Sequence, residues 1–181
     1  MEDDKLSNLI DNLPTTLQEV GTSIVALLAV AAEPLSIDAI EAWLLRREFP
    51  DEPDRASLER ALAVLSGLLK RTVNPDGEDG FTLFDHSVRL HILNYASLQQ
   101  TVRRLSKSLA NESLRPLGDA LEVYLLRHGV RHLIDVGQRD DALRLATGFD
   151  FLLRGSAVWS SPAGLLKDGM QIGCCCCSGL R

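Results

Sequence analysis

The stretch Phe81-Thr-Leu-Phe-Asp-His-Ser-Val-Arg-Leu-His-Ile-Leu93 decides how the chain folds. Its first four residues are aromatic, β-branched or apolar, a composition that favours a β-strand. Behind them the apolar residues recur at helical spacing, and Ser87 is a suitable N-cap for a helix. The stretch therefore predicts a short strand that runs straight into a helix, with His86 at the junction.

A turn signal lies directly before this strand. Asn74-Pro-Asp-Gly-Glu-Asp-Gly80 combines the residue types that tight turns prefer. Thr72-Val73 on its other side is suited to begin a partner strand. We therefore expect residues 72–84 to fold back on themselves as a β-hairpin.

Three helical patterns precede the hairpin. Apolar residues recur with a helical period from Leu17 to Ala32, and Glu33-Pro34 ends that pattern. Ser36 is a good N-cap for a helix over 37–45, and Asp54, behind a loop at 49–53, caps a helix from 55 to about 70. Three helices followed by a hairpin are typical of a winged-helix domain, which we place at residues 15–93 of a mainly α protein.

Beyond the hairpin the pattern stays helical. It continues from 88 to 109 and then from about 113 to a predicted break at His128-Gly129. A short helix over 130–136 is expected to end at Gly137, with an antiparallel partner over 140–146. These segments predict a helical-hairpin extension over residues 94–154. Residues 1–14 form an N-terminal lead-in, and residues 155–181 are expected to be an irregular or disordered tail.

Composition narrows the function classes. The 181 residues carry a net charge of −6, so nothing attracts the whole chain to nucleic acid or to an anionic membrane. The N-terminus lacks the cationic and apolar regions of a signal peptide, and the apolar stretch from Ile24 to Ala32 is too short to cross a bilayer. We expect a cytoplasmic protein without a membrane span.

Several segments together resemble a known family. They are Leu13-Pro-Thr-Thr-Leu-Gln-Glu-Val20, Ala26–Leu35, Phe84-Asp-His-Ser-Val-Arg-Leu90 and Tyr124–Leu133 with the residues up to Leu153. They resemble the winged helix and helical linker of signal-transduction ATPases of the STAND class, which includes the NACHT and NB-ARC types. The resemblance covers roughly residues 10–154.

The resemblance implies a regulatory role. In this family an ATPase core lies upstream and a sensor repeat domain downstream, and the winged helix holds the ADP-bound form closed. A histidine at the start of the helix after the wing commonly reaches the nucleotide β-phosphate, and His86 matches that position. An imidazole can donate a hydrogen bond to phosphate. The implied partners are the NTPase core and the sensor repeats, in cis or in trans.

The chain departs from the family in its chemistry. It has no G-x-x-x-x-G-K-[ST] phosphate loop and no apolar run that ends in paired acids for magnesium. It also has no G-x-S-x-G motif and no cysteine beside a histidine. We therefore expect no enzyme activity and no cofactor in this chain, with ADP or ATP reaching it only through a partner.

Other readings stay open. The His86 side chain could simply bond local backbone at a helix start. A winged helix can bind DNA through the helix over 55–71, which carries Arg55, Arg60, Lys70 and Arg71. Three acids at the hairpin, Asp76, Glu78 and Asp79, oppose such binding, so nucleic acid is disfavoured. An inactive truncated remnant is the third alternative.

The remaining candidates are assigned structural roles. We expect His91, His128 and His132 to be structural or solvent-facing, and a metal site at the last two is disfavoured because no third ligand is evident. The basic groups Arg103, Arg104 and Lys107, and Arg127 with Arg131, are interpreted as solvated helix faces, with contact to an acidic neighbouring domain as the alternative. Cys174, Cys175, Cys176 and Cys177 are adjacent and cannot readily converge on one ion; a disordered tail is favoured over lipidation.

Overall fold

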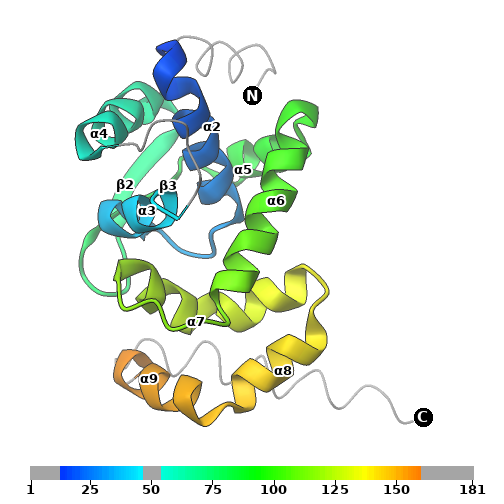
Figure 1. Ribbon diagram of the computed structural model, residues 1–181. Helices are drawn as coiled ribbons and strands as arrows, with labels where there is room; N and C mark the ends of the chain where they lie inside the picture. Colours follow the sequence, from blue (N-terminus) through cyan, green and yellow to red (C-terminus); the bar gives the residue numbers. More distant parts are fainter. Residues whose placement is uncertain (1–12, 47–53, 160–181) are drawn as a thin grey trace.

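The computed structural model describes residues 13–46 and 54–159. These residues form a mainly helical protein with one small antiparallel sheet (Figure 1). The elements are α2 (Thr15–Val30), β1 (Leu35–Ser36), α3 (Ile37–Leu44), α4 (Arg55–Val64), a 3₁₀ turn (Leu65–Gly67), β2 (Leu69–Val73), β3 (Asp79–Leu83), α5 (His86–Asn94), α6 (Ala96–Glu112), α7 (Ala120–Asp135), α8 (Arg139–Thr147) and α9 (Phe149–Trp159). The predictions for residues 1–12, for the loop at 49–53 and for the four cysteines lie outside the described residues.

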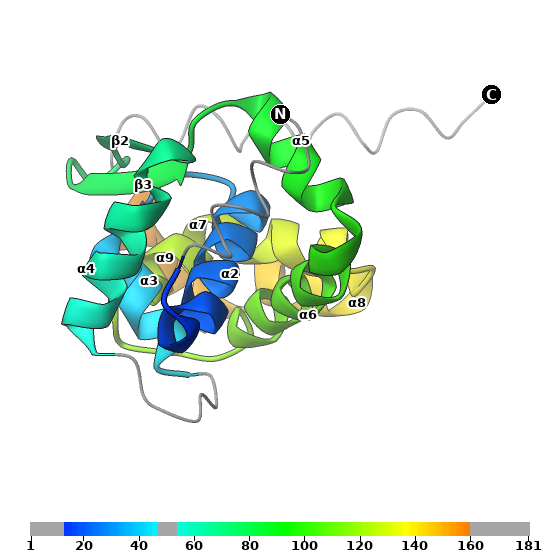
Figure 2. The same cartoon turned by 90° about the horizontal axis from the view of Figure 1, so that it is seen from above.

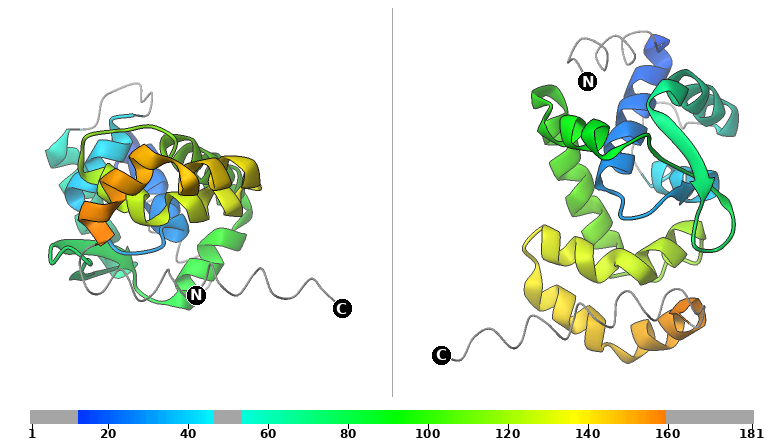
Figure 3. Two further views of the ribbon diagram at one scale, coloured as in Figure 1. Left: turned by 90° about the horizontal axis from the view of Figure 1, so that it is seen from below. Right: turned by 180° about the vertical axis from the view of Figure 1, so that it is seen from behind.

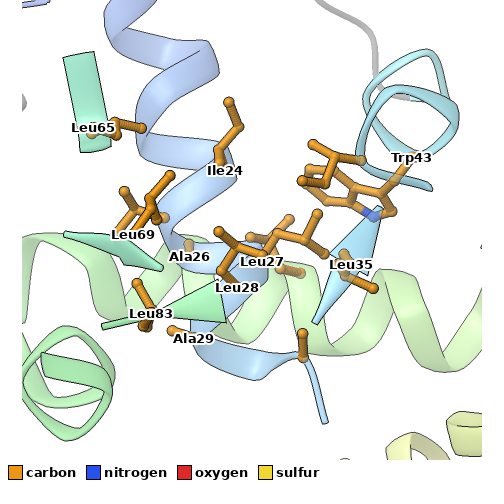
Figure 4. Packing of buried hydrophobic residues seen from close by; sticks show 14 of the residues in the cluster. Ile24, Ala26, Leu27, Leu28, Ala29, Leu35, Trp43, Leu65, Leu69 and Leu83 are labelled. Atoms are coloured by element: carbon orange, nitrogen blue, oxygen red, sulfur yellow. The ribbon is translucent and has the colours of Figure 1, made fainter. Parts of the chain in front are cut away.

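Helix α2 is the centre of the fold because it is apolar almost all round. Every residue from Ile24 to Ala29 is buried, which is typical of a helix enclosed by its neighbours. Figure 2 shows α3 and α4 on one side of it and α5 and α6 on the other. Its leucines meet the hairpin residues Leu69 and Leu83 in one direction and Trp43 of α3 in the other (Figure 4).

The predicted hairpin is confirmed. Strands β2 and β3 pair antiparallel, and β1 joins the free edge of β3, which gives the strand order β1-β3-β2. The Asn74 side chain accepts hydrogen bonds from the backbone N–H groups of Asp76 and Glu78. Gly77 supplies the positive φ of 86° that this turn requires. The sheet is thus fixed by the turn residues that the sequence displays.

The third helix is shorter than predicted. Asp54 caps it as expected, by accepting from the backbone N–H of Ser57, but α4 ends at Val64 and not near Lys70. A 3₁₀ turn follows, and β2 already begins at Leu69. The helical spacing of the leucines continues through this segment, but strand pairing with β3 takes over after Gly67.

The helix after the hairpin begins two residues earlier than predicted. Its N-cap is Asp85 and not Ser87, since the Asp85 carboxylate accepts from the backbone N–H of Val88. The expected run from 88 to 109 is also divided. Backbone in an extended conformation at Tyr95 separates α5 from α6, and the bend lets both Ile92 and Leu98 reach the core.

The predicted break at His128-Gly129 is wrong. Helix α7 runs without interruption from Ala120 to Asp135. Gly129 is there for packing, because a Cβ at this position would lie 2.8 Å from the Cβ of Ser113 beside α6. The glycine thus permits close approach of the chain and costs only some helix propensity. The predicted stop at Gly137 is confirmed, with a positive φ of 83° there.

Helices α8 and α9 form an outer layer beneath α7. Figure 3 shows, from below and from behind, that this pair covers the side of α7 that faces away from α2. The helix over 140–146 is confirmed as α8. Helix α9 continues past Arg154 to Trp159, so the regular structure does not end where the sequence predicted.

The buried apolar residues form two clusters. The larger one extends from α2 and the sheet through α6 to Leu121 and Leu125 of α7. The smaller one lies on the other side of α7, and its six buried residues are Ala110, Leu126, Leu133, Ala142, Leu145 and Phe151. The predicted boundary at 93/94 stays a prediction, although α6 shares its core with α2.

None of the helices in the described part of the chain combines the length and the hydropathy needed to cross a bilayer.

Candidate functional site

His86 occupies the position that the sequence predicted for it. It is the first residue of α5, directly after the turn that follows β3. Its side chain is exposed, and so is that of its neighbour Phe84. The alternative, in which the imidazole bonds local backbone, finds no such hydrogen bond among the described residues. The helix start is capped by Asp85 instead.

The capping carboxylate shapes the electrostatics around His86. Hydrogen bonds from the Ser87 hydroxyl and from the backbone N–H of Val88 lower the pKa of Asp85. Asp85 is therefore ionised at neutral pH and uses N–H donors of the helix start that would otherwise suit an anion. An incoming phosphate would have to be held by the imidazole of His86 and by groups from a partner.

A second group of polar residues connects α7 to the hairpin and to the segment after α2. We call this group the α7 latch. It comprises six side chains: Glu33, Asp76, Tyr124, Arg127, His128 and His132. The sequence does not predict the whole group, because Glu33 and Asp76 lie far along the chain from the four members on α7.

Arg127 is the centre of the α7 latch. Its guanidinium donates to Glu33 Oε1 at 2.7 Å and also to the Asp76 carboxylate at the tip of the hairpin. The side chains of Arg127 and Glu33 are 11% and 12% exposed, so this is a largely buried pair. The prediction of a solvated face is therefore wrong for Arg127, which joins three segments of the fold. It holds for Arg131, which is exposed and pairs with Asp135 one turn along.

Glu33 is held on its other oxygen by a histidine. His128 Nε2 lies 2.9 Å from Glu33 Oε2. Burial by itself would raise the pKa of Glu33, but the contacts with His128 and Arg127 outweigh it, and the pKa is lowered. The carboxylate is therefore ionised and fully engaged at neutral pH.

Tyr124 and His132 complete the α7 latch from inside. The Tyr124 hydroxyl accepts from the backbone N–H of Ala32 at 3.0 Å and lies 2.7 Å from His132 Nε2. With a neutral His132, the Tyr124 O–H donates to Nε2 in the tautomer whose proton is on Nδ1, and the hydroxyl oxygen accepts from Nε2 in the other. His132 is 3% exposed, and burial together with the charges of His128, Arg131 and Arg89 lowers its pKa to about 4.

The basic residues singled out in the sequence differ in whether they are exposed or paired within the fold. Arg103, Arg104 and Lys107 on α6 are exposed, as expected of a solvated face. Arg55, the first cation of the candidate recognition helix, donates to Asp38 at 2.6 Å and to Glu41 on α3. It is therefore occupied within the fold, which weakens the DNA-binding alternative.

The other histidines are structural, as predicted. His91 stacks on Tyr95 with ring centroids 5.8 Å apart. Within residues 13–46 and 54–159 no three His, Cys, Asp or Glu side chains are grouped so that they could hold a metal ion.

An open depression between α3 and the start of α7 is lined by charged residues that pair with each other. Arg46 binds Asp119, and Arg55 binds the two acids of α3 that line it. The depression therefore offers a ligand few charges that are not already neutralised.

The α7 latch could have been anticipated only in part. The spacing of Tyr124, His128 and His132 places three aromatic side chains on one helix face, and the structure confirms contacts among their rings. The partners Glu33 and Asp76 give no local signal.

No protein-family model, curated protein or solved structure matches the chain.

Proposed function

We propose that the chain is a non-catalytic regulatory and interaction module of a STAND-type signalling ATPase. In this proposal α2, α3, α4, the three-stranded sheet and α5 are the winged helix, and α6 to α9 are the helical linker. The order of helices and strands and the antiparallel sheet support the assignment. The nucleotide-binding core and the sensor repeats are the partners, and the site of action is the cytoplasm.

The observation that carries the proposal is the placement of His86. It stands at the start of the helix that follows the hairpin, with an exposed side chain and an exposed Phe84 beside it. A partner that presents a nucleotide can therefore reach the imidazole, which would donate a hydrogen bond to the β-phosphate. ADP and ATP bind this chain only in that complex.

The α7 latch supports the relay part of the proposal. Arg127 joins the hairpin, the segment after α2 and the linker helix α7. A displacement of the hairpin at the His86 end would therefore carry α7 along with it. Such a swing is how nucleotide state would reach the sensor side.

The test uses the tagged full chain co-expressed with phosphate-loop ATPases from the same source. We expect a complex that retains ADP, and we expect His86→Ala to accelerate ADP release at least tenfold, since one charge-assisted hydrogen bond is worth roughly 1.5–3 kcal/mol. Release is measured by fluorescence of a labelled ADP. Gln100→Ala, at another exposed position, is the matched control and should change nothing.

Two outcomes would contradict the proposal. One is micromolar nucleotide binding by the isolated chain, since it has no phosphate loop. The other is salt-sensitive retardation of duplex DNA in a mobility-shift assay, which would favour a transcriptional regulator.

A further inference from the structure

Strand β2 lies at an edge of the three-stranded sheet. The order β1-β3-β2 leaves one side of β2 without a neighbouring strand among the described residues, and Figure 2 shows β2 outside β3 at the margin of the molecule. Lys70, Arg71 and Val73 of this strand are exposed. The other edge strand, β1, has only two residues. β2 is therefore the edge that is long enough to pair with a further strand.

The register of the hairpin decides which backbone groups of β2 point outward. The backbone N–H of Asn74 donates to the carbonyl oxygen of Glu78 across the ladder. In an antiparallel ladder such bonded pairs alternate with pairs whose N–H and C=O groups point away from the partner strand. Val73, one position before Asn74, and Arg71, two positions before Val73, therefore direct these groups away from β3. No hydrogen bond from the described residues reaches them there.

The charge of β2 decides which side chains suit an added strand. Lys70 and Arg71 are adjacent, so their side chains lie on opposite faces of the sheet. The Arg71 guanidinium lies over the ring of Phe81, 5.4 Å from its centroid. No carboxylate of the described residues forms an ion pair with either cation, and β2 itself contains no acid. Carboxylates opposite both cations would form cross-strand pairs of opposite charge.

We propose that the outer edge of β2 binds an extended acidic segment of another protein as a fourth, antiparallel strand. The outward N–H and C=O groups select an extended backbone, because only a strand offers groups at the matching spacing. Arg71 and Lys70 select two consecutive carboxylates. Val73 favours a β-branched or apolar residue two positions before the first carboxylate. This binding does not depend on the role that we propose for His86.

Other occupants suit this edge less well. A second copy of β2 would bring four cations into one short ladder, which is unfavourable. Nucleic acid has no amide backbone that could pair with the strand, and Asp76, Glu78 and Asp79 beside the strand repel its phosphates. The acids of a short peptide, in contrast, lie opposite Lys70 and Arg71, at the part of β2 farther from the turn.

The test uses the peptide acetyl-Ser-Val-Thr-Glu-Glu-Ser-amide, titrated into the isotope-labelled full chain and followed by NMR with a reducing agent. In the proposed register its Val lies opposite Val73 and its first Glu opposite Arg71. We expect saturable shifts of the amide signals of these two residues. The dissociation constant should be roughly 0.1–1 mM, since a short peptide must be ordered on binding. The same peptide with Lys for both Glu should bind at least about fivefold more weakly at low salt.

Methylation of single peptide nitrogens separates strand pairing from charge attraction. In the proposed register the N–H of the first Glu points to Arg71, whereas the N–H of the second Glu points away from β2. Methylation of the first nitrogen should weaken binding about tenfold, because it removes a hydrogen bond and adds a methyl group between the strands. Methylation of the second nitrogen is the matched control and should change the affinity less than about twofold.

Val73→Pro tests the same edge from the side of the protein. Proline removes an outward N–H that the ladder with β3 does not use, so the hairpin should stay folded. The peptide should bind at least about fivefold more weakly to Val73→Pro, whereas Val73→Thr, which keeps the N–H, should bind it unchanged. The amide spectrum of each variant without peptide shows that it is folded.

Five results overturn the proposal. They are the absence of shifts up to about 5 mM peptide, shifts centred outside β2, equal binding of the two methylated peptides, equal binding of the Lys peptide, and unchanged binding by folded Val73→Pro. Equal binding of the methylated peptides would show charge attraction without strand pairing. A dimer that forms through β2 without peptide also overturns it, since a second copy would then be the occupant.

Discussion

The two faces of α7 are held in different ways. The face toward α2 and the hairpin combines burial of Leu121 and Leu125 in the large cluster with the polar contacts of the α7 latch. The face toward α8 and α9 contributes Leu126 and Leu133 to a cluster of six buried residues. Its links to the rest of the chain include one side-chain ion pair, between Arg154 and Glu122.

The difference assigns separate roles to the two layers. Hydrogen bonds and ion pairs have strict geometry, so the α7 latch fixes how α7 sits against the hairpin. Apolar contacts without direction, and few of them, leave α8 and α9 easier to open. The relay that we propose depends on the first property.

The largest expected effect on stability comes from truncating one large side chain in each of the two apolar clusters. Trp43→Ala removes a fully buried indole from the large cluster and should lower the free energy of unfolding by about 3–5 kcal/mol. Leu145→Ala in the small cluster should cost about 2 kcal/mol, the lower end for leucine, since its site lies near the surface. Urea titration followed by circular dichroism measures both.

Hydrogen exchange separates the two variants further. Leu145→Ala should accelerate amide exchange in α8 and α9 and leave α2 protected, because opening is local there. Equal acceleration in α2 would show that the two layers unfold together, and the comparison between the faces of α7 would lose its basis.

The next effect is a pH dependence that arises at His132. Burial lowers the pKa of His132 to about 4, below the value near 6.5 of a free imidazole. The unfolded chain therefore binds the proton more tightly. The contribution of His132 to the free energy of unfolding is complete above pH 6.5. It is lost as the pH falls from about 6.5 to 4, and it does not change further below pH 4. The total is roughly 3 kcal/mol.

The surroundings of His132 explain why its protonation is unfavourable in the folded protein. Burial disfavours the charged imidazole most, and the positive charges of His128, Arg131 and Arg89 add to this effect. His132→Gln keeps an acceptor for Tyr124 and does not titrate. Its unfolding free energy should be nearly flat from pH 6.5 to 4.5, where carboxylates such as Glu33 still remain ionised. An identical slope in both proteins would contradict the assignment.

The sequence predicted the parts of the fold that depend on local signals. The hairpin follows from Asn74 and Gly77, the caps at Ser36 and Asp54 were found, and Gly137 marks the end of α7. These residues act on backbone within a few positions of themselves, so their effect can be read without knowledge of the fold.

The predictions that were wrong concern residues whose role depends on contact with a segment far along the chain. Gly129 looks like a helix break, but its lack of a side chain serves the approach of Ser113. Arg127 looks like one member of a solvated pair, but Glu33 and Asp76 come to it from far along the chain. The position of His86 at the start of the helix was predicted from the sequence, and its side chain is exposed in the structure, whereas its role in nucleotide contact stays a prediction.

The smallest expected effect concerns the link between Arg127 and the hairpin tip. Asp76→Ala removes only the outer partner, which is 38% exposed, and should cost less than about 1 kcal/mol. Arg127→Ala also deprives the buried Glu33 of a donor and should cost roughly 1–3 kcal/mol. A double-mutant cycle isolates the Arg127–Asp76 coupling, measured by urea unfolding at low and high salt.

The salt series sharpens the comparison between the faces of α7. An exposed pair is screened, so the coupling should approach zero in about 1 M salt, while the penalty of Arg127→Ala should persist because Glu33 is enclosed. If the coupling exceeds 2 kcal/mol and resists salt, the hairpin tip is as tightly bound as the inner pair. If Arg127→Ala costs nothing, the latch does not fix α7, and the rigid relay loses its mechanical support.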